Sequence, residues 1–346
     1  MTTNVKLAIA TLALLVCSVW VYSDSVSRGE RFSRGQKLLA NLNPDEVATI
    51  EIVQGSEQLT LERSAEGFTI EQNHGYPARN DAINRFLRDL LDIGLAKEVG
   101  TGTALNEELE IEPTTDTTVE IALLNDADQE MVRLRLGKAI EDRSGRYVRR
   151  LDREGDPIYL TEGTVALSTT LDSFIRNEIV NVSQSEVVRV EGDGFLLEAP
   201  EPDASIVLSA IPGGKKEKSV ETNKLKSILS RLRFETALLA DDDEVRQLKF
   251  ERVLQIDLAD ESGYQLAFAS TDEKSYIQIR GHHNVAQVQI ELDTPKDELE
   301  EKVDTLSRID EIEDFNAFHA SWVYEVSSFT ADKLKLVKSD LLEDAS

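Results

Sequence analysis

The stretch PDEVATIEIV, from Pro44 to Val53, decides the fold, because its pattern returns later in the chain. The second copy, QSEVVRVEGD, runs from Gln184 to Asp193 and has the same Glu-Val pair, followed after two residues by a β-branched residue and a glutamate. The apolar positions of both stretches are those of a strand with one buried face. The repetition indicates a chain that is built twice on one plan.

The segments that follow each copy occur in the same order. Two further strand-like segments precede an amphipathic helix, and about four strands and a helical stretch come after it. From Val47 to Ile83, the first apolar residue of the first helix, is 36 residues, and the corresponding distance from Val187 to Leu225 is 38. The first helix has its apolar residues at helical spacing: Ile83, Phe86, Leu87, Leu90 and Leu91. The second is expected to carry Leu225, Ile228, Leu229 and Leu232 at the same kind of spacing.

We therefore expect an α+β fold, in which an N-terminal transmembrane helix precedes two similar units produced by an internal duplication. Each unit is expected to be an antiparallel sheet with one face covered by an amphipathic helix. The expected parts are a transmembrane anchor or signal peptide at 1–23 and a connector at 24–41. A first α+β repeat at 42–183 and a second at 184–346 follow, the second with an acidic helical C-terminal tail. The helical stretches that end the two halves are expected at 165–179 and 295–318.

The N-terminal segment Leu7–Tyr22 is sixteen residues without a charge. As a helix it would measure roughly 24 Å, somewhat less than the hydrocarbon core of a bilayer. Trp20 and Tyr22 suit the membrane interface, which favours an anchor over a cleaved signal peptide. The charges on the two sides leave the orientation open, because the positive-inside rule would keep the basic residues that follow in the cytoplasm: Arg28, Arg31, Arg34 and Lys37.

Composition excludes some classes of partner. The chain has 65 Asp and Glu against 38 Lys and Arg, a net charge of −27, which repels phosphate backbones and makes a nucleic-acid partner improbable. The acidity is read as a solvated surface, with a cation-binding or basic-partner surface as the alternative. The single cysteine, Cys17, excludes an intramolecular disulfide, and it lacks the small preceding residue that lipid attachment requires. It is interpreted as an apolar residue of the membrane segment.

The sequence predicts no metal, cofactor or catalytic site. His282 and His283 are adjacent, so in a strand their side chains would point to opposite faces, and a polar hairpin turn at 281–284 is the favoured interpretation. Residues 125–130 lack the glycine and distal glutamate of a calcium loop and are expected to form a hairpin turn. Residues 241–244 are expected to be a solvated helix end or loop. The remaining histidines, which form no metal motif, are His74 and His319.

Three groups of residues are candidate binding sites. Residues 211–218 contain glycines and lysines but lack the spacing of a phosphate-binding loop, and they are read as an exposed connection or a basic partner contact. Tyr147, Arg149 and Arg150 could form an anion site, but a cross-strand polar ladder is the favoured interpretation. A pocket that contains Tyr264 and Tyr276 would favour a ligand-binding module.

Three stretches carry a resemblance to a known family: GQKLLANLNPDEVATIEI at 35–52, GFTIEQNHGYPARNDAINRFLRDLLDIG at 67–94, and GRYVRRLDREGDPIYL at 145–160. They resemble a domain-of-unknown-function family of bacterial membrane-anchored proteins, often encoded beside gliding-motility-type ABC transporter components. The resemblance covers roughly residues 35–180 well and the second half loosely, and Phe68 stands where a tryptophan is commoner. The family supplies no catalytic residue, and it implies that the large domain lies in the periplasm.

The sequence thus leads us to expect a non-enzymatic, single-pass protein of the bacterial inner membrane. Its expected role is that of an accessory or scaffold subunit of an ABC transporter-type complex, which would bind a permease or its extracytoplasmic subunit and contact the bilayer through residues 7–22. The alternative is a periplasmic binding module for a polysaccharide or a peptide. A hydrolase that uses acidic residues is the least favoured hypothesis, because a chain this acidic offers many carboxylate pairs by chance.

Overall fold

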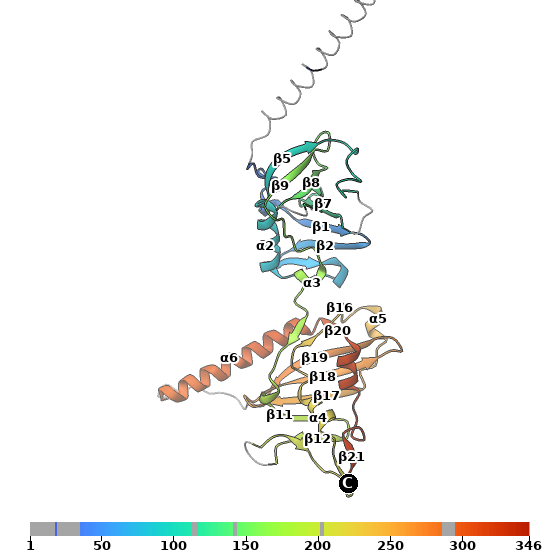
Figure 1. The fold of residues 1–346 in the computed structure, drawn as a ribbon. Helices are drawn as coiled ribbons and strands as arrows, with labels where there is room; N and C mark the ends of the chain where they lie inside the picture. The colour runs from blue at the N-terminus through green and yellow to red at the C-terminus, as the bar shows by residue number, and fades with distance from the viewer. Residues whose placement is uncertain are drawn as a thin grey trace, which may run out of the picture. The chain divides into compact units, whose positions relative to one another are not determined.

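The computed structural model describes residues 35–112, 117–140, 144–200, 204–285 and 295–345, together with residue 18. The chain divides into two units, one that ends at Ile175 and one that begins at Arg176 (Figure 1). Each unit is built around one large antiparallel sheet. The predicted anchor at 7–22 lies outside the described residues.

Unit 1 contains a nine-stranded sheet in the order β4-β3-β2-β1-β6-β7-β8-β9-β5. The first copy of the repeated stretch begins with a 3-10 turn, η1 (Pro44–Glu46), capped by the side chain of Asn43, and continues into β1 (Thr49–Gln54). β1 pairs with β2 on one side and with β6 on the other, so it lies inside the sheet. The other strands are β2 (Glu57–Ser64), β3 (Gly67–Ile70), β4 (Tyr76–Pro77), β5 (Gly94–Gly100), β6 (Val119–Leu124), β7 (Glu130–Ala139), β8 (Arg146–Arg150) and β9 (Ile158–Glu162).

The predicted amphipathic helix of unit 1 is α2 (Asn80–Leu91). Its spacing places four apolar residues in the core, where the ring of Phe86 meets that of Phe174 edge to face at 5.6 Å. Phe174 belongs to α3 (Leu171–Phe174), so the helix also holds the end of the unit in place. The buried residues of α2 are Ile83, Phe86, Leu87 and Leu90.

Unit 2 contains an eight-stranded sheet in the order β13-β12-β11-β17-β18-β19-β20-β16. The second copy of the repeated stretch begins with η3 (Gln184–Glu186), closed by a capping box from Ser183, and continues into β11 (Val187–Gly192). The other strands of this sheet are β12 (Phe195–Glu198), β13 (Val207–Leu208), β16 (Thr236–Leu239), β17 (Arg252–Leu258), β18 (Ser262–Ser270), β19 (Ser275–His283) and β20 (Trp322–Val326).

Smaller elements complete unit 2. Two short antiparallel pairs lie outside the main sheet, β10 (Glu178–Val180) with β15 (Leu232–Arg233), and β14 (Lys215–Glu217) with β21 (Leu342–Asp344). The helices are α4 (Ser219–Lys226), α5 (Asp243–Arg246), α6 (Lys296–His319) and α7 (Ser328–Leu334). A short 3-10 turn in unit 1, η2 (Glu71–Asn73), completes the set of described elements.

The two sheets follow the same strand order. In unit 1 the order after β4 is β3-β2-β1-β6-β7-β8-β9-β5, and in unit 2 it is β13-β12-β11-β17-β18-β19-β20-β16. Before the helix come four strands of the main sheet in unit 1, β1 to β4, and three in unit 2, β11 to β13. In both units the next strand of the main sheet takes the far edge, and four further strands fill the middle. The repeated stretch forms the strand where the two parts of each sheet meet, β1 or β11.

The predicted α+β class with a transmembrane helix is wrong for the described chain. Strands make up 39% and helices 23% of it, so the units are mostly antiparallel sheet, with helices as the smaller component. In the described ranges, none of the helices combines the length and the apolar character that a membrane span requires.

Two of the helices predicted from the sequence are shorter in the structure, which lowers the helix content. The stretch at 165–179 yields only the short helix α3 and the start of β10, because Ser168, Thr169 and Thr170 are poor helix formers and the backbone of Thr170 is extended. The helix expected through Leu232 ends with α4 at Lys226, and the chain leaves it through Arg231, whose φ is +53°. The predicted helix at 295–318 is confirmed as α6. It is not a terminal tail, since β20 follows it and enters the sheet between β19 and β16.

Candidate functional site

One face of the unit 2 sheet carries polar side chains in rows. In an antiparallel sheet, directly paired residues point to the same face, so the register of β11, β17, β18 and β19 places their side chains side by side. Residues two positions apart on one strand also point to the same face, so neighbouring rows lie on the same face of the sheet. The first row contains Arg189, Asp257, Gly263 and His282, and the second contains Glu191, Gln255, Gln265 and Arg280. Val253, Ala267 and Gln278 form a third.

Helix α6 lies along the end of β19. Strand β20 pairs with β19 only from Ser275 to Ile277, so the rest of that strand edge is left to the helix. Asn316 satisfies both backbone groups of Gly281: its Oδ1 accepts from the Gly281 N–H at 2.7 Å, and its Nδ2 donates to the Gly281 carbonyl at 2.9 Å. The C-terminal half of α6 is thereby fixed beside the rows, while its N-terminal half extends away from the sheet (Figure 1).

Two cavities adjoin each other between α6 and the polar rows. One has a volume of about 510 Å³ and the other of about 470 Å³, and both are lined by Gln265, Arg280 and Asn316. The larger extends toward Gln278 and Trp322, and the smaller toward other polar residues of the rows and of α6. We call this pair of cavities the α6 groove. The polar residues that line only the smaller cavity are Gln255, His282, His283 and Glu313.

Asp257, beside the groove, is held by three neighbours. His282 Nε2 lies 2.7 Å from its Oδ1, Gln255 donates to the same oxygen at 3.2 Å, and an Arg189 nitrogen lies 3.6 Å from Oδ2. Burial alone would raise the pKa of Asp257, but the hydrogen bonds from His282 and Gln255 and the nearby charges outweigh it, so the pKa is lowered. Asp257 is therefore a carboxylate whose acceptor positions are largely used within the sheet.

Three other side chains of the α6 groove have hydrogen-bonding groups that no residue of the described chain uses. Within the described chain, no hydrogen bond or ion pair involves the side chains of Gln265, Gln278 or Arg280. Gln265 and Arg280 are directly paired across β18 and β19, and Gln278 lies two residues from Arg280 on the same strand. Together they offer two carboxamides and one guanidinium to whatever enters the groove.

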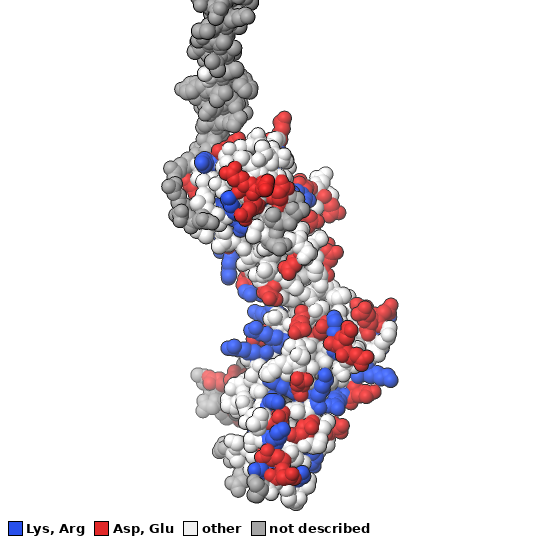
Figure 2. Space-filling model, turned by 45° about the vertical axis from the view of Figure 1, so that its right-hand side comes forward, with Lys and Arg blue, Asp and Glu red and all other residues white. Residues whose placement is uncertain are grey.

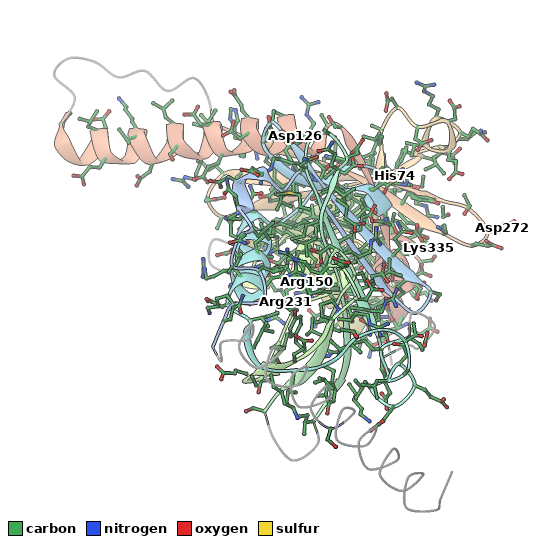
Figure 3. The ribbon with its side chains drawn as sticks, turned by 90° about the horizontal axis from the view of Figure 1, so that it is seen from above. His74, Asp126, Arg150, Arg231, Asp272 and Lys335 are labelled. Atoms are coloured by element: carbon green, nitrogen blue, oxygen red, sulfur yellow. The ribbon has the colours of Figure 1, made fainter. Side chains whose placement is uncertain are left out.

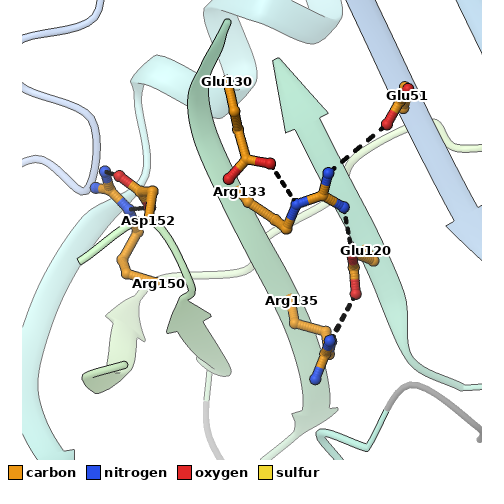
Figure 4. Close-up of polar contacts among 7 residues, drawn as sticks. All are labelled: Glu51, Glu120, Glu130, Arg133, Arg135, Arg150 and Asp152. Carbon is orange, nitrogen blue, oxygen red and sulfur yellow. Dashed lines mark hydrogen bonds and ion pairs between the residues drawn. The ribbon is translucent and has the colours of Figure 1, made fainter. Parts of the chain in front are cut away.

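The corresponding face of unit 1 carries a network of charged side chains that pair with one another (Figure 4). Glu120 lies 2.7 Å from a nitrogen of Arg133 and 2.8 Å from one of Arg135, and Arg133 also reaches Glu130 at 2.6 Å. Burial would raise the pKa of Glu120, but the two arginines outweigh it and hold the pKa below its usual value. Because each carboxylate already has its cations, this network serves the stability of the sheet.

The group Tyr147, Arg149 and Arg150 forms neither an anion site nor an exposed polar ladder. The side chain of Arg149 is 2% exposed and donates to the Gly102 carbonyl, and burial lowers its pKa. Arg150, which is 5% exposed, pairs with Asp152 at 2.5 Å and donates to the Leu38 carbonyl. Both arginines thus hold loops against the sheet.

Three stretches are predicted from the sequence to be turns or loops rather than metal sites, and the structure shows the backbone of each. The hairpin turn at 125–130 is confirmed: Asn125 Oδ1 accepts from the N–H groups of Ala127 and Gln129. Residues 241–244 lead into α5, as expected of a helix end. The predicted turn at 281–284 is wrong, because residues 281–283 end β19. In the described ranges, no group of three or more His, Cys, Asp or Glu side chains could hold a metal ion.

The lysines of residues 211–218 are paired within unit 2. Lys215 lies 2.7 Å from Asp344, and Lys216 lies 3.3 Å from Glu343, because β14 pairs with β21. Lys218 reaches Glu221 at 3.4 Å. The favoured interpretation, an exposed connection, is replaced in part by the paired strand β14, and the alternative, a basic partner contact, is neutralised by neighbouring carboxylates. On the face shown in Figure 2, basic and acidic side chains of unit 2 are likewise interspersed.

The two tyrosines considered for a ligand pocket have different surroundings. Tyr264 lines a separate cavity of about 410 Å³ under α6, and its ring meets that of Phe315 at 5.3 Å. Tyr276 is 7% exposed and belongs to a core cluster with Leu238, Val245 and Val323. The structure therefore does not bring the two rings into one pocket.

Sequence reasoning missed the α6 groove. The signal that could have found it is the phase of the polar residues in consecutive strands, QID in β17, YQLA in β18 and IQIR in β19. The alternation shows that each strand has one polar face, but only the register shows that Gln255, Gln265 and Arg280 form one row.

The comparisons with known proteins reach only part of this groove, because the family match ends in β18, before β19 and α6. No curated protein and no solved structure matches the chain significantly. A family described as a domain of unknown function, DUF4340, matches residues 69–267, from β3 of unit 1 to β18 of unit 2. Because this match covers more than half of the sequence, the chain belongs to the DUF4340 family.

Proposed function

We propose that the protein is a non-enzymatic accessory or scaffold subunit of an ABC transporter-type complex, and that it binds its partner through the α6 groove. The observation that carries the contact is the set of hydrogen-bonding side chains on the groove floor, Gln265, Gln278 and Arg280, which have no partner in the described chain. The association with a transporter draws its support from the sequence resemblance of residues 35–180.

The occupant that fits this floor is a polypeptide segment. A carboxamide offers both a donor and an acceptor, and an extended peptide presents the same two groups along its backbone. Gln265 and Gln278, from neighbouring strands, can therefore pair with backbone groups of a segment that lies across the sheet. Binding by an extended segment needs no deep pocket, which agrees with the open form of the two adjoining cavities.

The proposed location is the periplasmic side of the bacterial inner membrane. Leu7–Tyr22 would contact the bilayer, which its uncharged composition and its interfacial Trp20 and Tyr22 support. The net charge of −27 argues against a nucleic-acid partner in any compartment. Protease digestion of spheroplasts tests the location: degradation of both units is expected, and their full protection would contradict the proposal.

Site-directed photocrosslinking in membranes tests the partner. In the full chain, a photoreactive phenylalanine derivative replaces Ala317, an exposed residue of α6 that lines the groove, and the matched control carries it at Asp126, in the exposed turn between β6 and β7 (Figure 3). An adduct with an ABC permease or its extracytoplasmic subunit is expected from position 317 and not from position 126. Adducts of equal yield at both positions, or no protein adduct at 317, would contradict the proposal.

The second candidate is a periplasmic binding module for a polysaccharide or a free peptide. The polar lining of the α6 groove is the observation that favours it, since carboxamides and guanidinium groups also hydrogen-bond hydroxyl groups. This candidate predicts that purified protein binds an oligosaccharide or peptide in the absence of any membrane partner. The photocrosslinking experiment separates the two, because a module of this kind gives no adduct with a permease.

A further inference from the structure

Arg280 occupies a particular place in the α6 groove, because it lines both of the adjoining cavities. It is directly paired with Gln265 of β18, so the two side chains start a short distance apart on the same face. Gln278 lies on that face as well, two residues earlier in β19. Three side chains with N–H donors therefore surround the point where the two cavities meet.

Neither of the nearby carboxylates pairs with Arg280 in the described chain. Asp257 is engaged by His282, Gln255 and Arg189. Glu313 of α6 lines the smaller cavity, yet in the described chain it forms no ion pair with Arg280. Arg280 thus faces a groove without a carboxylate bound to it, although the chain has 65 Asp and Glu residues.

A carboxylate is the group that this arrangement is suited to receive. It accepts hydrogen bonds only, and its two oxygens match the fork of a guanidinium. The amide N–H groups of Gln265 and Gln278 can donate to its remaining lone pairs. A cationic ligand would meet Arg280 itself, and an uncharged one would leave the guanidinium without its strongest acceptor.

We propose that Arg280, Gln265 and Gln278 bind a carboxylate side chain of the polypeptide segment that enters the α6 groove. This inference rests on the proposed function, and it adds the chemical class of the partner. The segment carries one acidic residue within an otherwise uncharged stretch, because the net charge of −27 repels a polyanion.

The test is a fluorescence anisotropy titration of the full chain with a labelled peptide of sequence Thr-Val-Glu-Val-Thr, amidated at its C-terminus. A second peptide has glutamine in place of the glutamate. The glutamate peptide is expected to bind about tenfold more tightly than the glutamine peptide. Arg280→Gln is expected to abolish that difference, and Arg280→Lys to retain part of it, because lysine keeps the charge but not the fork.

Two further variants make the result specific. Glu313→Gln removes a negative charge from the wall of the smaller cavity, where it would repel the glutamate of the peptide. It is therefore expected to tighten binding of the glutamate peptide only. Arg88→Gln, which removes an exposed arginine of α2, is the matched control and is expected to change neither affinity. The thermal unfolding of each variant shows whether it is folded, which is expected for Arg280→Gln because the side chain is exposed.

The outcomes distinguish this inference from the proposed function. Equal binding of the two peptides, or an unchanged preference in Arg280→Gln, overturns the carboxylate site, while photocrosslinking at position 317 still decides whether a polypeptide occupies the groove. Arg280-dependent binding of an oligogalacturonate, without binding of the glutamate peptide, overturns the polypeptide as the ligand class.

Discussion

His319 is a buried histidine at the C-terminal end of α6. It is 7% exposed, its Nδ1 lies 2.6 Å from the Tyr324 hydroxyl, and the rings of Phe315 and Phe318 lie 4.0 and 4.9 Å from its own. Burial disfavours the charged imidazolium and lowers the pKa to about 4 from 6.5. Folding therefore keeps this side chain neutral at pH values where it is protonated in the unfolded chain.

His319 is expected to make unit 2 less stable as the pH is lowered. Between pH 6.5 and 4 the unfolded state binds a proton that the folded state does not, so the free energy of unfolding decreases by about 3 kcal/mol over that range and then levels off. Urea unfolding at several pH values measures it. His319→Gln should flatten this part of the profile, and His283→Gln, which removes an exposed histidine, should not. Equal slopes in the two variants would show that His319 does not cause the dependence.

Gly137 of β7 is required by the loop that covers it. A Cβ at this position would lie 2.5 Å from the Leu109 carbonyl oxygen and 3.2 Å from the Ile111 Cβ, while the N–H of Lys138 donates to that same carbonyl. Gly137→Ala is expected to destabilise the protein by about 1–3 kcal/mol, because the backbone must shift. Gly213→Ala, with nothing within 4 Å, is expected to stay within about 0.5 kcal/mol. Chemical denaturation compares the two, and similar losses would contradict the steric argument.

At the scale of elements, α6 depends on Asn316 for its position. The side chain replaces the strand partner that Gly281 lacks, with one donated and one accepted hydrogen bond. Asn316→Ala is expected to lower the free energy of unfolding by about 1–3 kcal/mol, because both backbone groups lose their partner. Asp310→Asn, at an exposed position of the same helix, is the control and should have little effect. Faster hydrogen exchange of the Gly281 amide in Asn316→Ala, but not in Asp310→Asn, would show that the stability is lost at this contact.

The sequence was informative about elements with a clear period. The apolar spacing of α2 and the alternation of β17, β18 and β19 were sufficient to predict them. At 225–232 the apolar residues have helical spacing, and the prediction of a continuous helix there was wrong. Short turns bury the same residues after α4 ends. Local periodicity records which residues are buried, and several backbone paths can bury one set. The class was wrong because such short segments were counted as helices.

The candidate site could not be read from the sequence for a related reason. The α6 groove depends on the register between strands and on Asn316, which meets Gly281 from 35 residues away. Neither residue type is unusual, and nothing local marks the pair. Polar side chains of one strand become a binding surface only when three strands and a helix are placed together, which is tertiary information.

At the scale of the molecule, each unit has its own sheet and its own core. Differential scanning calorimetry is therefore expected to resolve two transitions. Gly137→Ala should lower the midpoint of one, and Asn316→Ala that of the other, by about 2–4 °C for each kcal/mol. A single transition that both substitutions lower equally would show that the units unfold together.

The pairing of β16 with β20 has a consequence for the synthesis of the chain. Thr236 pairs with Glu325, so 89 residues separate the two partners. At about 5–20 residues per second, a ribosome needs about 4–18 s to make that intervening stretch. Throughout this time β16 has been translated without its partner, and from His283 onward the same is true of the edge of β19, because β20, the strand that joins them, is made after both. The speed of translation, rather than the strength of the finished sheet, therefore determines how long these two edges stand open to other nascent chains.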